Sequence, residues 1–193
     1  MQGVATNWMT DVTLSSRMVW RGIDFASSPS LQGLLAYKHK RVEVGALGIV
    51  TTNGSKEGFG NTLEVYATYN IGNLTLTVDD YFFFNAADSL NNYFDWRTGK
   101  TQHFVEARAR FAWHSLAATA GYVLHKSAAD HSNGLYLEAE YSPTSYLTFT
   151  AGGVTAASGL NFQTRAGITN VSITAKRTIT VSKTFHILTL LSD

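Results

Sequence analysis

The segment F-V-E-A-R-A-R-F, residues 104–111, alternates strictly between apolar and charged side chains. One parity holds the apolar residues Val105, Ala107, Ala109 and Phe111. The other parity holds the charged residues Glu106, Arg108 and Arg110. Because successive side chains of an extended chain point to opposite sides, this pattern predicts a β-strand whose two faces meet different environments.

The same period of two recurs along most of the chain and is as clear at residues 62–70 and 134–141. It predicts about twelve strands and no helix of comparable length. The expected strands span residues 6–21, 30–38, 41–51, 62–70, 73–84, 101–112, 115–125, 133–141, 145–154, 161–167, 170–178 and 183–191. Sixteen glycines and only two prolines suit many strands joined by turns. We therefore expect a single all-β domain over residues 1–193.

Connectors of two lengths alternate between these segments. Short turns are expected at residues 38–41, 70–73, 113–115, 142–145 and 167–170. Longer loops are expected at residues 22–29, 52–61, 85–100, 126–132 and 155–160. This alternation predicts an up-and-down antiparallel transmembrane β-barrel of a Gram-negative outer membrane, with short periplasmic turns and longer extracellular loops. A long first connector and an even number of strands would place both termini in the periplasm.

The apolar face carries few charges, and small residues occupy its mid-strand positions: Ala46, Ala67, Ala107, Ala118, Ala120 and Ala139. A packed soluble core needs large side chains there, whereas lipid chains fill the space around small ones. Asp80 and Arg177 are the exceptions, and both are expected near the outer rim. The alternative is a soluble lipocalin-like barrel or a sandwich, in which the apolar face would be the core.

Aromatic residues gather where the expected strands end. The set comprises Trp20, Tyr37, Tyr69, Phe82, Phe84, Phe111, Trp113, Tyr141 and Tyr146. Two bands of such rings are typical of the aromatic girdles of an outer-membrane barrel. We therefore expect outer-membrane lipid as a partner of the apolar face.

The polar face would then line the lumen. Reading each strand by parity places inside it Asp11, Arg17, Arg21, Arg41, Glu43, Glu64, Asp79, Glu106, Arg108, Arg110, Glu138, Glu140, Arg165 and Lys176. Seven acids and seven bases make this expected lumen charge-balanced. Such a balance suits a salt-bridged interior or a weakly selective pore, whereas a strongly one-signed lumen would indicate an ion filter.

No pattern of catalytic, cofactor-binding or metal-ligating residues occurs. None of the six histidines lies in a recognisable motif, and no G-x-S-x-G, H-E-x-x-H or P-loop sequence is present. Asp88 and Asp95 in the longest loop suggest calcium only weakly, and a solvated loop is the simpler interpretation. A net charge of +1 gives no argument for nucleic-acid binding. We therefore expect neither an enzyme nor a cofactor or metal.

The loop at residues 85–100 is the longest and contains the apolar residues Leu90, Tyr93, Phe94 and Trp96. These side chains could dock on other outer-membrane proteins, pack over the mouth, fold inward as a constriction or pack against neighbouring loops. The sequence leaves these arrangements open.

The first predicted strand contains Val19-Trp20-Arg21-Gly22 within L-S-S-R-M-V-W-R-G-I-D-F, followed by S-S-P-S-L-Q-G at residues 27–33. This opening resembles that of a family of uncharacterised porin-like outer-membrane barrels of bacteria, and G-I-T-N at residues 167–170 is similar to a patch in such proteins. The resemblance implies a location more than an activity. The chain departs from it in ending T-F-H-I-L-T-L-L-S-D, without the terminal aromatic residue usual in outer-membrane barrels.

Two functional hypotheses follow from these observations. The first is a porin-like barrel for transport of small polar solutes by passive diffusion through a charge-balanced lumen. The alternative is a non-conducting structural or accessory barrel subunit of an outer-membrane complex. An outer-membrane enzyme is a third class, which no motif supports.

Overall fold

The computed structural model describes residues 7–25, 27–53, 61–84, 91–97, 100–126, 130, 132–180 and 186–192. These residues form antiparallel β-structure and contain no helix, which confirms the predicted all-β class. In this part of the chain, accordingly, there is no helix of the length and apolarity that a membrane span requires.

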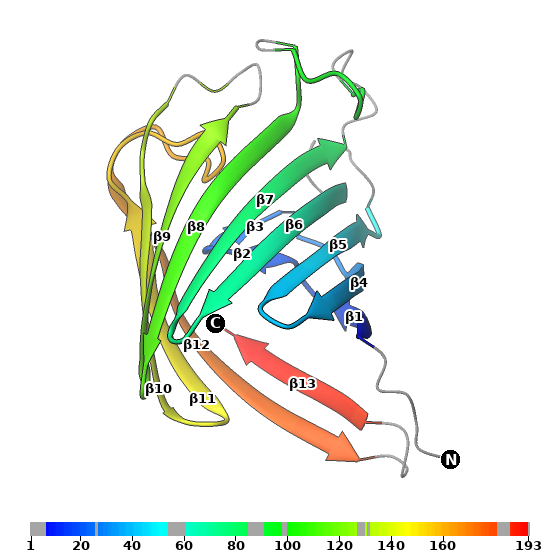
Figure 1. Ribbon diagram of the computed structural model, residues 1–193, viewed down its shortest axis with the longest axis vertical. Coiled ribbons are helices and arrows are strands. Elements are labelled where there is room, and N and C mark those ends of the chain that lie inside the picture. Colours follow the sequence, from blue (N-terminus) through cyan, green and yellow to red (C-terminus); the bar gives the residue numbers. More distant parts are fainter. Residues whose placement is uncertain are drawn as a thin grey trace.

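Eleven strands form one sheet in the order β1-β4-β5-β6-β7-β8-β9-β10-β11-β12-β13. Their bounds are β1 Trp8–Ser15, β4 Ser30–His39, β5 Val42–Thr51, β6 Asn61–Ile71, β7 Leu74–Phe84, β8 His103–Trp113, β9 Leu116–His125, β10 Tyr136–Thr144, β11 Leu147–Val154, β12 Gly167–Thr180 and β13 His186–Ser192. Two short strands, β2 Val19–Trp20 and β3 Ile23–Asp24, pair separately. The sheet is strongly curved, and this hairpin lies on its concave side (Figure 1).

Sheet neighbours are antiparallel and, apart from the inserted hairpin, consecutive in the chain, as an up-and-down topology requires. Tight turns join β4 to β5, β6 to β7, β8 to β9 and β10 to β11, all at one end of the strands. We call this the short-turn end. The longer connectors lie at the opposite end, which we call the long-loop end. The alternation of connector lengths therefore agrees with the sequence pattern over most of the chain.

The prediction of a turn at residues 167–170 was wrong, because these residues begin the continuous strand β12. Residues 161–167, predicted as a strand, belong mainly to the connector before it. The register against β11 shifts here, since Gly152 pairs with Asn170 whereas Gly153 pairs with Ile168. This β-bulge accommodates the extra residue without a reversal of the chain.

The predicted strand at residues 6–21 was also wrong in its second half. β1 ends at Ser15, and the chain then folds back on itself as the β2–β3 hairpin. Arg21 and Gly22 form the two-residue turn, with φ angles of 51° and 77°. Positive φ at both positions is the signature of a type I′ turn, whose twist matches that of antiparallel strands.

The sheet has two edges, β1 and β13, and no pairing joins them within the described residues. The predicted closed barrel is therefore an open, curved sheet in this structure, with both edges on the same side in Figure 1. Because eleven strands alternate in direction, β1 and β13 run the same way. The sheet of the described residues has an odd number of strands, and the periplasmic location of both termini stays a prediction.

The two faces of the sheet differ in the way that the alternation predicts. On the concave face, Asp79 and Glu106 are 0% exposed. On the convex face, Val78 and Phe111 are 48% and 52% exposed. The concave side also holds the apolar core, which comprises Phe25, Tyr81, Phe83, Phe104, Val123 and Leu160.

Candidate functional site

The charged side chains of β8 point into the concave space, and its two arginines pair with carboxylates of other strands. Arg108 donates from Nε and Nη2 to Asp79 on β7, with both distances 2.6 Å. Arg110 donates from Nε and Nη2 to Glu140 on β10, at 3.1 and 2.9 Å. Two parallel hydrogen bonds between a guanidinium and a carboxylate group form a strong, planar interaction. The concave wall is therefore cross-linked by ion pairs between strands.

The β2–β3 hairpin brings a third arginine to this wall. Arg21 donates from Nη1 and Nη2 to the two carboxylate oxygens of Glu106, at 2.9 and 2.7 Å. Nη1 also donates to Oδ1 of Asn161 at 3.2 Å. The Arg21 guanidinium carbon lies 4.3 Å from the ring centre of Trp20 and 3.9 Å from that of Tyr136. The Arg21 guanidinium group is thus held by its hydrogen bonds to Glu106 and Asn161 and by the ring faces of Trp20 and Tyr136.

The tip of the hairpin contacts strand β12. A Cβ atom built on Gly22 would lie 1.9 Å from the backbone oxygen of Thr169, in the bulge of β12. Only a residue without a side chain permits this approach, and the positive φ of Gly22 favours glycine independently. Local turn geometry and contact with β12 therefore explain the glycine of the Trp-Arg-Gly sequence.

Aromatic rings pack the hairpin against the long-loop half of the concave face. Trp20 lies 5.4 Å from Tyr81 and 5.9 Å from Phe25, measured between ring centres. Phe25 in turn stacks on Phe83 at 5.8 Å. Tyr81 and Phe83 belong to the part of β7 nearest the long loops. The hairpin and these aromatic side chains therefore form one packed cluster in this half of the concave space.

A polar cavity of about 340 Å³ lies on the short-turn side of the hairpin. It is lined by Trp20, Arg21, Thr75, Thr77, Arg108, Arg110, Thr119, Tyr136, Glu138 and Glu140. Glu138 accepts hydrogen bonds from the Tyr136 hydroxyl and, at 3.0 Å, from Nδ2 of Asn170. Apart from Trp20, every side chain that lines the cavity carries a hydroxyl or a charged group.

The structure distributes the predicted lumen residues unevenly. The concave face from β5 to β10, with the hairpin, gathers Arg21, Glu43, Glu64, Asp79, Glu106, Arg108, Arg110, Glu138 and Glu140. Arg17 pairs with Asp24 at 2.6 Å and is largely exposed, Arg41 lies in the β4–β5 turn, and Arg165 lies in the connector before β12. Asp11 on β1 and Lys176 on β12 are also exposed. The enclosed wall consequently carries more carboxylates than guanidinium groups, unlike the equal numbers expected from sequence.

The aromatic set divides in a similar way. Six members lie near the short turns on the convex face or in a turn: Tyr37, Tyr69, Phe111, Trp113, Tyr141 and Tyr146. Trp20 belongs instead to the hairpin on the concave side. Phe82 faces outward but has 0% exposure, because Tyr93 and His103 cover it at 5.3 and 4.7 Å between ring centres. The band at the short-turn end is therefore the more complete one.

Residues 91–97 of the longest loop pack on the convex face rather than inside. Trp96 stacks on His103 at 3.7 Å between ring centres, and Nε2 of His103 contacts the backbone oxygen of Tyr93 at 2.6 Å. Nδ1 of the same ring contacts Asp80 at 2.8 Å. Phe94 remains 86% exposed. Among the alternatives, this described part of the loop is not an inward constriction; Asp88 lies outside the described residues.

The loop also carries a local ion pair. Arg97 donates from Nε and Nη2 to the carboxylate of Asp95, at 2.9 and 2.6 Å. These side-chain hydrogen bonds lower the pKa of Asp95 to about 2. The Asp95 carboxylate thus forms an ion pair with Arg97. No group of three or more metal-ligating side chains is found in the described part of the chain.

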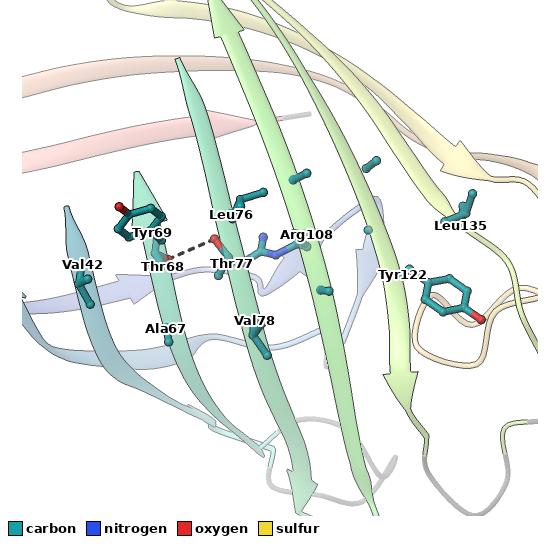
Figure 2. A pocket seen from close by; sticks show the side chains of 14 residues that line it. Val42, Ala67, Thr68, Tyr69, Leu76, Thr77, Val78, Arg108, Tyr122 and Leu135 are labelled. Carbon is teal, nitrogen blue, oxygen red and sulfur yellow. Dashed lines mark hydrogen bonds between the residues drawn. The ribbon is translucent and has the colours of Figure 1, made fainter. Parts of the chain in front are cut away.

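A shallow apolar groove of about 520 Å³ crosses the convex face from β5 to β9 and reaches Leu135, just before β10. Its floor is made of alanines, including Ala67, Ala107 and Ala120. Figure 2 shows Val42 and Tyr69 at one end of the groove and Tyr122 and Leu135 at the other. The alanines at mid-strand positions therefore form a groove on the convex face.

Comparison with protein-family models, with curated proteins and with solved structures finds no match for this chain.

Proposed function

We propose that this chain forms a porin-like β-barrel in a bacterial outer membrane, through which small polar solutes diffuse passively. The observation that carries the proposal is the inverted distribution of side chains between the two faces of the sheet. Asp79 and Glu106 are completely enclosed, whereas Leu14, Ile168 and Val171 are 79%, 80% and 73% exposed. A soluble barrel would bury the apolar residues and expose the carboxylates.

Lipid is the solvent that suits such a convex face. The exposed aliphatic residues and the groove lining are uncharged except for Arg108, whose guanidinium group binds Asp79 on the concave face. The aromatic residues near the short turns, such as Tyr69 and Trp113, match the interfacial band of an outer-membrane barrel. In this orientation the short turns face the periplasm, and β1 begins there.

The hydrated concave face provides the proposed path for solutes. Its ion pairs and threonines line the cavity between the short turns and the hairpin. Carboxylates outnumber guanidinium groups on this wall, so we expect the path to favour cations over anions.

The second candidate is a non-conducting accessory barrel of an outer-membrane complex. The hairpin that packs in the long-loop half of the concave space favours it. In this case residues 91–97, with Phe94 exposed, would present a contact surface to other outer-membrane proteins.

Two measurements test the proposal. A heat-dependent gel shift in detergent tests whether the protein is a folded membrane barrel, and a monomer soluble without detergent would contradict the membrane assignment. Current through the folded protein in planar lipid bilayers separates the two candidates. Reproducible current steps support diffusion, whereas folded protein without current, including variants that lack the hairpin, supports the accessory role.

A further inference from the structure

We propose that the β2–β3 hairpin is the constriction of the permeation path and that the Arg21–Glu106 ion pair is the contact that keeps it closed. This inference rests on the proposed function, because it requires a path through the barrel. It gives the segment Val19-Trp20-Arg21-Gly22 a role in permeation.

The hairpin is not needed to connect its neighbouring strands. Ser15 at the end of β1 lies directly opposite Ser30 at the start of β4 in the antiparallel register. A two-residue turn would join such a pair. Residues 16–29 are therefore an insertion, and the chain directs its β2–β3 part into the concave space (Figure 1).

The inserted hairpin reaches across to several walls. Arg21 contacts Glu106 on β8 and the ring of Tyr136 on β10, and Gly22 abuts Thr169 on β12. Trp20 packs on Tyr81 of β7. These contacts separate the polar cavity on the short-turn side from the long-loop end. A solute that crosses the barrel must therefore displace the hairpin or pass it.

One ion pair dominates the polar contacts of the hairpin tip. The side chains of Arg21 and Glu106 are 5% and 1% exposed, so neither charge has water as an alternative partner. Removing Arg21 alone leaves the buried Glu106 carboxylate with only the more distant Arg108, whose Nε lies 3.7 Å away, whereas removing both members avoids this imbalance. A double substitution is therefore the better test of the contact, since it releases the hairpin without this imbalance.

Three variants of the full chain provide the test. The first replaces residues 16–29 by Asn-Gly, which keeps Ser15 opposite Ser30. The second is Arg21→Ala/Glu106→Ala. The third is the matched control Asp95→Ala/Arg97→Ala, which removes an ion pair in the loop of residues 91–97, outside both the hairpin and the polar cavity. Each variant is first checked for the heat-dependent gel shift of a folded barrel.

Conductance in planar bilayers and hydrogen exchange of residues 19–24 are then measured. We expect a conductance several times that of the native chain for the hairpin replacement, and frequent openings for Arg21→Ala/Glu106→Ala with faster exchange of its hairpin amides. The control should match the native chain in both measurements.

The outcomes separate the two ideas. Equal, measurable currents from the native chain and from the hairpin replacement would overturn the constriction but leave the porin proposal standing. Absence of current from every folded variant would overturn the proposed function, and the constriction with it. Unchanged exchange in Arg21→Ala/Glu106→Ala would show that this ion pair does not hold the hairpin.

Discussion

Arg21 and Glu106 are opposite charges withdrawn almost completely from solvent, with side chains 5% and 1% exposed. Such a pair is stable only when its hydrogen-bonding groups are satisfied, because desolvation of two ions is costly. Here Asn161, Trp20 and Tyr136 complete the surroundings of the guanidinium group. At the scale of single residues, this is where substitution should have its largest effect.

Arg21→Ala should destabilise the folded protein by about 3 kcal/mol, because the buried Glu106 carboxylate then loses both hydrogen bonds to Arg21 and keeps only Arg108, whose Nε lies 3.7 Å away. Arg21→Ala/Glu106→Ala should lose less than Arg21→Ala alone. Reversible denaturant unfolding in lipid vesicles measures the difference. Equal losses for the single and double variants would indicate that the two side chains are not energetically coupled.

Gly22→Ala should loosen the hairpin, because a Cβ atom there would lie 1.9 Å from the Thr169 oxygen at a φ of +77°. We expect a loss of about 1–3 kcal/mol from strain, seen as faster hydrogen exchange at residues 19–24. Gly48→Ala is the control, since a Cβ atom at Gly48 meets nothing within 4 Å. A hairpin that exchanges equally slowly in both variants would refute the proposed close contact.

At the scale of elements, the period-two pattern was sufficient to predict most strands, because one face of each strand is apolar and the other polar. It failed where tertiary contacts determine the path of the chain. The residues of the β2–β3 hairpin alternate like a strand, but their packing partners lie on β7, β8 and β12. Likewise, residues 167–170 have the composition of a turn, yet a bulge against β11 absorbs them.

The candidate site was predictable in part for the same reason. Parity alone placed Asp79, Glu106, Arg108 and Arg110 on one face, and the structure brings them together. Parity could not identify which charges pair, because the partners of Arg110 and Arg21 lie on strands distant in sequence. It also could not place Arg41 and Arg165, which lie in connectors.

The position of residues 91–97 on the convex face depends on the buried ring of His103. His103 contacts Asp80 and the Tyr93 backbone oxygen through its two nitrogens and stacks on Trp96. His103→Phe should keep the stacking but lose both polar contacts, so trypsin should cleave after Arg97 faster than in the native protein. His39→Phe, in an exposed position, should leave cleavage unchanged. Unaltered cleavage of His103→Phe would show that stacking alone holds the loop.

At the scale of the whole molecule, the charges of the concave wall bear on selectivity. Glu138 accepts hydrogen bonds from Tyr136 and Asn170 rather than from an arginine. Glu43 accepts a hydrogen bond from Tyr66 and has the largely exposed Lys38 as its ion-pair partner, at 3.8 Å. In the hairpin-replacement variant, the reversal potential measured under a potassium chloride gradient across a bilayer should therefore have the sign that indicates a preference for cations. Glu138→Gln should reduce this preference. Selectivity for anions would contradict the excess of carboxylates inferred for the path.

In the proposed barrel, the convex face meets lipid and the concave face meets water. Single cysteines introduced in turn at residues 105–110 of β8 and labelled with a fluorophore test it directly, because the native chain has no cysteine. In vesicles, a lipid-phase quencher should quench labels at Val105, Ala107 and Ala109 and spare labels at the intervening charged positions. Quenching at the charged positions instead, or at every position alike, would contradict the proposed orientation of the sheet.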